Sequence, residues 1–316
     1  MTIGANFDTL PEGGIRNIYS RCPFKIEVLD GDRLLGNATA FFVENDDEWF
    51  IITNGHVVTG RHAFTRQRLG DGSPDGYPRR LRLHLPVHVE LGEHDGYQPT
   101  RLSYDLYADG QPRWYVHPSL GHRCDVVALE ARFYKEQKVP WHPAINRISD
   151  DRVPVMPGVP VFILGYPKGI SVKLGMPIWK SGYVASEPRF PITIEQDSEA
   201  AQQQGLLDGL PAFFVDSQTR PGMSGSPIVA QYTGTWNRND PYGTPTPDEG
   251  LQGNLGNLVR GETRSEFIGC YSGRVQSREL DAGLGICWRK DVIDTICAAR
   301  LLAAHPHTES AAGGDN

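Results

Sequence analysis

The chain has no long hydrophobic run. Nowhere in its 316 residues do about 18 consecutive apolar residues follow one another, so no membrane-spanning helix is expected. The N-terminal segment MTIGANFDTLPEGG has no basic stretch followed by an apolar one, so we expect no secretory signal peptide. These absences predict a cytoplasmic protein of bacterial type with no membrane partner.

Cysteine is sparse and unevenly spread. An odd number of widely separated cysteines does not suit a disulfide framework. The five thiols fall within or beside apolar runs, at Cys22, Cys124, Cys270, Cys287 and Cys297. The sequence therefore predicts buried thiols in a reducing compartment.

Positive charge is not in excess. The formal net charge is −7, and lysine and arginine are scattered along the chain. A nucleic-acid-binding protein carries a basic patch or stripe, so we expect no nucleic-acid partner. Hydrophobic residues make up 39% of the chain and charged residues 22%, which is ordinary for a globular protein.

Long helical patterns are also scarce. Most apolar segments are short, rich in Val, Ile, Phe and Tyr, and separated by Gly, Pro, Asn or Asp, as in FKIEVLD (24–30) and VPVFILGYP (159–167). In residues 80–91, leucines alternate with polar residues at a period of two. This is the pattern of strands, and many short strands without long helices predict an all-β sandwich or barrel.

A few segments depart from the strand pattern. Two polar inserts, 60–79 and 233–264, are expected to be loops, and residues 305–316 are expected to be a disordered tail. Residues 289–304 have helical spacing and predict a C-terminal helix packed on the β body, with one apolar face made of Val292, Ile293, Ile296, Cys297 and Leu301.

Three segments carry residue types suited to nucleophilic catalysis. Ser224 lies between two glycines in QTRPGMSGSPIVA, His56 follows a strand in FIITNGHVVTG, and Asp125 opens an apolar strand in VHPSLGHRCDVVALE. Each residue alone is more often structural: a turn serine, a strand-end histidine, a capping aspartate. Together they occur in the order His, Asp, Ser, which is the chymotrypsin order and differs from those of subtilisin and the α/β-hydrolases.

The matching segments are T-N-G-H-V-V around the histidine, D-V-V-A-L-E at the aspartate, G-x-S-G-S-P around the serine, and IGCYSGR further on. In these the chain resembles trypsin/chymotrypsin-fold serine proteases, nearest to the HtrA-type bacterial branch without its PDZ domains. The resemblance implies two packed antiparallel β-barrels with a C-terminal helix. Residues 1–145 would form the half that carries His and Asp, and residues 146–304 the half that carries Ser and the helix, followed by the tail 305–316.

The same resemblance implies a mechanism and a substrate class. Ser224 would attack the scissile carbonyl, His56 would take its proton, and Asp125 would orient the imidazole. The backbone N–H groups of Gly222 and Ser224 would form the oxyanion hole, because a glycine places no Cβ in the way. The expected partner is a protein or peptide substrate, and no cofactor is expected.

Departures from the family pattern bear on specificity. The residue six before the nucleophile, expected near the base of the primary specificity pocket, is Gln218, so no preference for Arg or Lys is expected. Ser272 and Arg274 lie on the expected substrate-flanking strand. Arg274 would either favour an acidic or polar substrate residue or point to solvent. Met223 replaces the aspartate of digestive trypsins, so activation through a clipped N-terminus is not expected.

The sequence leaves three possible functions to weigh. The first is an active serine endopeptidase, and the second is a pseudoprotease that binds peptides on the same fold without cutting them. The presence of all three triad residue types favours the first. A third reading is a metal site at His84, His88 and His94. It is disfavoured because i and i+4 on a strand lie about 13 Å apart, so no metal is expected. The sequence predicts neither the oligomeric state nor a regulatory partner.

Overall fold

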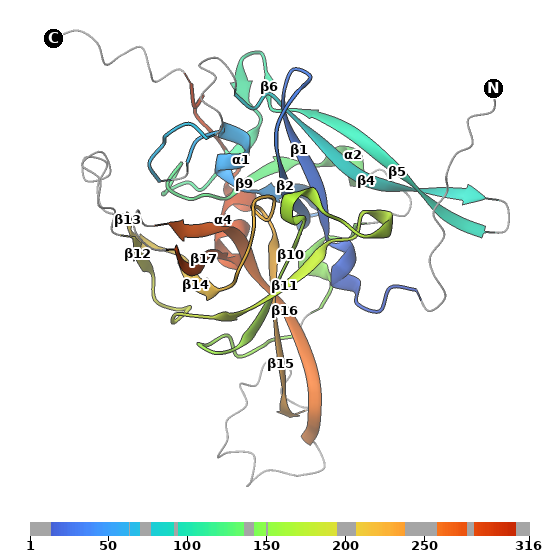
Figure 1. Cartoon of the computed structure of the whole chain (residues 1–316), viewed down its shortest axis with the longest axis vertical. Helices are drawn as coiled ribbons and strands as arrows, with labels where there is room; N and C mark the ends of the chain where they lie inside the picture. Colours follow the sequence, from blue (N-terminus) through green and yellow to red (C-terminus); the bar gives the residue numbers. More distant parts are fainter. Residues whose placement is uncertain are drawn as a thin grey trace.

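A computed structural model of the chain describes most of its residues. The described ranges are 14–62, 64–69, 77–91, 94–135, 142–149, 151–194, 207–237, 258–276 and 281–307. They form two β bodies that lie one above the other in Figure 1, with the helix α4 between them.

The first body is an eight-stranded antiparallel sheet in the order β18-β8-β9-β3-β2-β1-β4-β5. The alternating pattern of residues 80–91 is confirmed as a strand. Its leucines Leu81, Leu83 and Leu85 are fully buried against the β1 and β2 side chains. The strands are β1 (Pro23–Asp30), β2 (Arg33–Asn45), β3 (Glu48–Thr53), β4 (Arg80–Leu91), β5 (His94–Asp105), β8 (Trp114–Val116), β9 (Val127–Glu130) and β18 (Leu301–Leu302).

The second body is a closed six-stranded barrel, β10-β11-β14-β17-β16-β15, whose paired strands are all antiparallel. The predicted all-β, chymotrypsin-like architecture in two halves is thereby confirmed. The barrel strands are β10 (Pro160–Gly165), β11 (Ile178–Val184), β14 (Ala212–Asp216), β15 (Pro227–Asn237), β16 (Leu258–Gln276) and β17 (Asp281–Arg289).

Short elements complete the chain. Two-stranded sheets pair β6 (Tyr107–Ala108) with β7 (Gln111–Pro112) and β12 (Ile192–Ile194) with β13 (Leu207–Leu210). The short helices are α1 (Gly55–Thr59), α2 (Arg132–Lys135) and the 3-10 turns η1 (Ile18–Arg21), η2 (Ile145–Arg147), η3 (Pro167–Gly169) and η4 (Lys173–Gly175).

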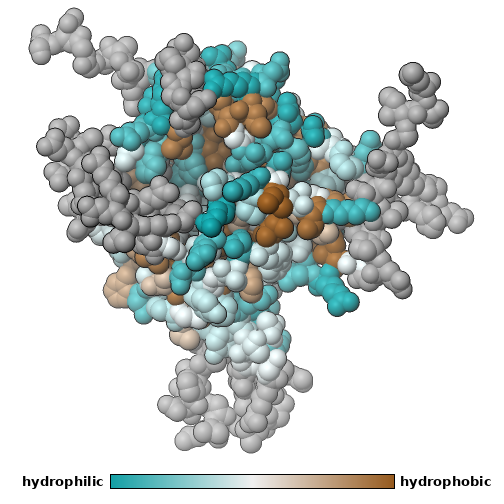
Figure 2. All heavy atoms as spheres, in the orientation of Figure 1, coloured by the Kyte–Doolittle hydropathy of each residue, from teal (hydrophilic) through white to brown (hydrophobic). Residues whose placement is uncertain are grey.

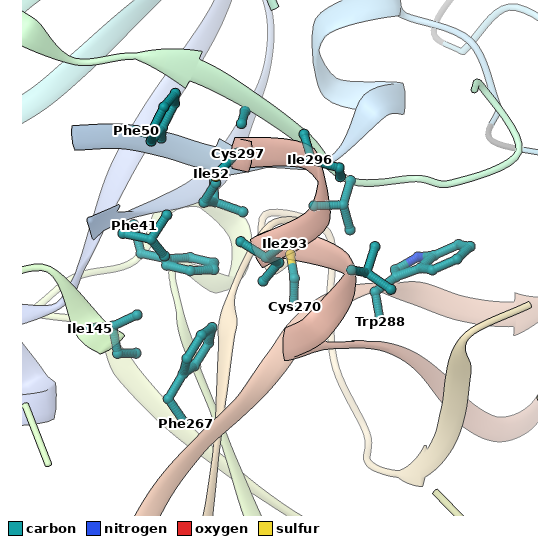
Figure 3. Packing of buried hydrophobic residues seen from close by; sticks show 14 of the residues in the cluster. Phe41, Phe50, Ile52, Ile145, Phe267, Cys270, Trp288, Ile293, Ile296 and Cys297 are labelled. Atoms are coloured by element: carbon teal, nitrogen blue, oxygen red, sulfur yellow. The ribbon is translucent and has the colours of Figure 1, made fainter. Parts of the chain in front are cut away.

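The predicted C-terminal helix exists but is shorter than its sequence pattern. Helix α4 spans Lys290–Ala299 and buries four of the five residues of its predicted apolar face between the two bodies, where Ile293 and Ile296 meet Phe41 of the sheet and Trp288 of the barrel (Figure 3). The fifth, Leu301, lies beyond the helix and is 47% exposed. The helix ends because Arg300 takes a left-handed conformation with φ 48°. The next two residues then pair with β8 as strand β18, so the helical reading of 300–304 was wrong.

The second polar insert is not wholly a loop. β15 runs to Asn237 and β16 begins at Leu258, and their pairing carries a hairpin away from the barrel (Figure 1). The loop expectation was therefore wrong at both ends of 233–264, because Thr, Trp and Val in these ends suit a strand. Residues 238–257 lie outside the described part of the chain.

The thiols and the surface agree with a folded globular protein. All five cysteines are free and buried, and burial raises the pKa of Cys297 to about 12. None of the helices in the described part of the chain has the length and apolar character to cross a membrane. The face in Figure 2 shows apolar side chains in separate groups among hydrophilic ones, as protein surfaces usually do.

A buried histidine predicts acid sensitivity. His142 packs on Phe24, its Nδ1 donates to the Arg21 carbonyl at 2.6 Å, and burial lowers its pKa to about 3. The unfolded chain binds this proton at a pKa of about 6.5, so stability falls as the pH drops from about 6.5 towards 3. We expect wild type to lose about 1.4 kcal/mol per pH unit more than His142→Asn between pH 6 and 4. Urea unfolding at several pH values checks this, and parallel curves would contradict it.

Candidate active site

Ser224 lies in the turn between β14 and β15, and two left-handed glycines shape that turn. Gly222 has φ 97° and Gly225 has φ 81°. A Cβ on Gly222 would lie 2.3 Å from the Tyr166 carbonyl oxygen, and one on Gly225 would lie 2.1 Å from the Thr39 carbonyl oxygen. Only glycine fits at either place, so the two glycines present Ser224 at the end of a closely packed turn.

Thr39 of β2 holds this turn from the other body. Its N–H donates to the Ser224 carbonyl at 2.8 Å, and its hydroxyl donates to the Gly222 carbonyl at 2.8 Å. Thr39 is fully buried, and its own carbonyl accepts from the Thr53 hydroxyl at 2.9 Å. Two hydrogen bonds from this one strand residue therefore tie the Ser224 turn to the first body.

His56 lies on α1, directly after the β3 strand. Its ring Nδ1 is 2.6 Å from Asp125 Oδ2, and its backbone N–H donates to Asp125 Oδ1 at 2.8 Å. The Asn54 amide donates to the Asp125 carbonyl at 2.8 Å. With Nδ1 occupied by a carboxylate, the Nε2 atom is the one available to accept a proton.

The Asp125 carboxylate is buried, with 1% of its side chain exposed. Besides the two donors on His56 it accepts a hydrogen bond of 2.5 Å from the Ser272 hydroxyl of β16. A Cβ on Gly55 would come within 3.2 Å of Oδ1, so this glycine leaves room for the carboxylate. A buried charge is stable only when it is hydrogen-bonded in this way.

His56 and Ser224 line one pocket of about 340 Å³ between the two bodies. The pocket is lined by the first body, by the turn that contains Ser224, and by the barrel strands β16 and β17. The lining residues are His56, His62, Phe64, Leu69, Asp125, Thr219, Arg220, Pro221, Ser224, Tyr271, Ser272, Gly273 and Ile286.

Two backbone donors beside Ser224 are available. Within the described part of the chain, neither the Gly222 N–H nor the Ser224 N–H donates to another protein group. The turn around them is fixed, since the Lys168 N–H donates to the Pro221 carbonyl at 2.6 Å. Fixed, unspent donors next to a nucleophile are what an oxyanion hole requires.

The sequence around this site matches a known protein family. The model of the trypsin-like peptidase domain matches residues 38–236, which include the histidine, the aspartate and the serine described above. The chain belongs to the trypsin-like peptidase family.

Three solved structures show the range of similarity to this peptidase. A mutant of the Rv3671c protease from M. tuberculosis, in its inactive form, is 15% identical, with 92% of this chain and 94% of that chain covered and a TM-score of 0.38. The HtrA-type protease AlgW with a tripeptide is 11% identical, with coverages of 90% and 62% and a TM-score of 0.43. The serine endoprotease from Yersinia pestis is 11% identical, with coverages of 89% and 62% and a TM-score of 0.40. A search of the curated proteins gives no match.

Of the three residues predicted to bind substrate, only one is among the described residues that line the pocket. Ser272 lines the pocket but spends its hydroxyl on Asp125. Gln218 is exposed and is not among the lining residues, whereas its neighbour Thr219 is buried and lines the pocket. Arg274 pairs with Gly285 in the sheet register, and its side chain lies outside the described residues.

The structure also adds residues that the sequence did not single out. His62, Phe64 and Leu69 come from the first polar insert and line the pocket next to His56. Burial is the main cause that lowers the pKa of His62 below its usual value, so its imidazole is neutral at neutral pH. No local motif marks these residues or Thr39, because only the tertiary fold brings them to the nucleophile.

Of the three histidines considered as metal ligands, the structure describes the side chain of His84 alone. His84 Nε2 lies 3.0 Å from Glu27 Oε1, and the side chains of His88 and His94 lie outside the described residues. Where side chains are described, no group of three or more His, Cys, Asp or Glu could hold a metal ion.

A substitution at Gly222 tests the turn. We expect Gly222→Ala to lower peptidase turnover by about 10²–10³-fold, because the new Cβ meets the Tyr166 carbonyl and rotates an oxyanion donor away. Hydrolysis of a fluorogenic peptide measures it. The control is Gly158→Ala, whose glycine also has a positive φ, 89°, but meets nothing within 4 Å. Equal losses in both variants would contradict a role for Gly222 in the site.

Proposed function

We propose that this peptidase is a serine endopeptidase that cleaves proteins or peptides through Ser224, His56 and Asp125. The observation that carries the proposal is the hydrogen-bonded pair of His56 and the buried Asp125, which lies on the same pocket as Ser224. The turn around Ser224 leaves the Gly222 and Ser224 N–H groups without a hydrogen-bond acceptor in the described part of the chain. Cysteine chemistry is disfavoured, since all five thiols are buried.

In the acylation step the Ser224 hydroxyl oxygen attacks the carbonyl carbon of the scissile bond, and His56 Nε2 accepts its proton. The negative charge that develops on the carbonyl oxygen is stabilised by the Gly222 and Ser224 N–H groups. When the tetrahedral intermediate collapses, the C–N bond breaks and His56 gives the proton to the leaving amine. The product is an acyl ester on Ser224.

Deacylation repeats the step with water. His56 Nε2 takes a proton from the water, whose oxygen attacks the ester, and the C–O bond to Ser224 breaks as the proton returns to its oxygen. Asp125 holds the imidazole in the tautomer with its proton on Nδ1 and stabilises the imidazolium that forms twice in each cycle. The Ser272 hydroxyl keeps the carboxylate in place.

The proposal is tested on an unstructured protein substrate. Purified full-length chain is incubated with β-casein, and new N-termini are identified by mass spectrometry. We expect internal cleavage by wild type. Binding of casein without any cleavage by a folded chain would favour the pseudoprotease reading and overturn the proposal.

A further inference from the structure

Tyr271 of β16 lines the pocket and is held at both its hydroxyl and its backbone. It is buried, with 1% exposed, yet it lines the pocket that contains Ser224. Its hydroxyl is hydrogen-bonded to the hydroxyl of Thr219, five residues before the nucleophile. Its backbone is fixed as well, because its carbonyl accepts from the Gly225 N–H at 3.0 Å and its N–H donates to the Ser226 carbonyl at 2.8 Å.

The tyrosine ring fills the space between two pocket walls. On one side its hydroxyl reaches Thr219, and on the other its ring lies directly on the backbone of Gly285 in β17. A Cβ on Gly285 would come within 2.4 Å of Cε2 and 3.0 Å of the hydroxyl oxygen of Tyr271. The Tyr271 side chain therefore spans from Thr219 to Gly285 of β17 and shortens the pocket between them.

The pocket offers no counter-charge to a positively charged substrate side chain. Asp125 is the only acid among the lining residues in the described part of the chain, and His56 and Ser272 engage it. Arg220 adds a positive charge to the lining, and its Nη1 donates to the Thr219 carbonyl at 3.2 Å. A Lys or Arg side chain of a substrate would lose its hydration here without gaining an acidic partner.

We propose that Tyr271, held by Thr219, is the specificity-determining residue of this pocket and restricts the residue before the cleaved bond (P1) to small side chains without positive charge, such as Ala, Thr or Val. The inference rests on the proposed function, because it takes Ser224 as the nucleophile. Its physical basis is volume and charge. The ring and the hydroxyl pair close the end into which a longer side chain would extend, and a site that is too short discriminates by exclusion.

Phosphonate probes test the inference without a known substrate. Peptidyl diphenyl phosphonates that share one scaffold and differ only in P1, as Ala, Val, Phe or Lys, are reacted with the wild-type chain, and labelling rates are read by intact mass. We expect Ala and Val probes to react at least about 10-fold faster than Phe and Lys probes. Equal or faster reaction of the Phe or Lys probe would overturn the inference.

A fluorophosphonate without a P1 side chain separates this inference from the proposed function. If the fluorophosphonate labels the chain but the Ala and Val probes do not, the P1 inference fails alone. If the fluorophosphonate does not label a folded chain, the proposed function fails and the P1 inference fails with it.

Variants at the ring add a second test. We expect Tyr271→Val to raise the ratio of Phe to Ala labelling rates by about 10-fold or more, because it opens the end of the pocket. Tyr271→Phe keeps the ring and should keep the wild-type order. Tyr183→Val, at an exposed tyrosine, is the matched control. A ratio unchanged in folded Tyr271→Val would overturn the role of the ring, and if that variant does not fold, the wild-type probe series still decides.

Discussion

Ser224→Ala is expected to lower peptide hydrolysis on the order of 10⁶-fold. The substitution removes the oxygen that forms the acyl bond, while the turn itself survives. The hydrogen bonds that Thr39 makes to Ser224 and Gly222 involve only the backbone of those two residues. The variant should therefore fold with unchanged stability, as measured by thermal unfolding beside the hydrolysis assay.

The matched control is Ser226→Ala, two residues along the same turn. The Ser226 hydroxyl is buried and has no hydrogen-bond partner in the described part of the chain. Its loss should leave hydrolysis unchanged, since the contacts of Ser226 to Met223 and Tyr271 are made by its backbone. Comparable hydrolysis by Ser224→Ala and wild type would contradict the assignment of the nucleophile.

Asp125→Asn is expected to lower turnover about 10⁴-fold with little change in the fold. An asparagine amide donates where the carboxylate accepts, so His56 would turn its Nδ1 into an acceptor and carry its proton on Nε2. That tautomer cannot take the proton of Ser224. The measurement is kcat for a fluorogenic peptide, together with fluorophosphonate labelling, which should slow in parallel.

Asp291→Asn serves as the control for loss of a negative charge. Its side chain is 68% exposed on the first turn of α4, where it contacts Arg289. The exposed variant should keep wild-type turnover. A loss at Asp125→Asn no larger than that at Asp291→Asn would show that the buried carboxylate does not orient the histidine.

Local motifs were enough to find the residues that we propose carry out the chemistry. His56 follows β3 and Asp125 precedes β9, and these two strands pair with each other. Ser224 lies in a turn whose glycines can be read from the sequence. Each of these signals spans a few residues, and the resemblance to a family supplied their common geometry. The strand pattern predicted an all-β fold, and the resemblance implied its two halves.

What the sequence could not show depends on contacts between distant segments. Thr39 looks like any residue of an apolar strand, and only the packing of the two bodies brings it to Ser224. Tyr271 was recognised as part of a strand, but its partner Thr219 is fixed by tertiary structure. The end of α4 shows the same effect, because pairing of β18 with β8 overrides the helical spacing after Arg300.

The most direct test of a working triad is covalent labelling of wild type by a fluorophosphonate, read by intact mass and peptide mapping. The probe reacts only with a serine whose base and oxyanion donors are assembled. The structure predicts one adduct per chain, located on Ser224. A folded wild-type chain that gains no adduct, or gains one on a different residue, would contradict it.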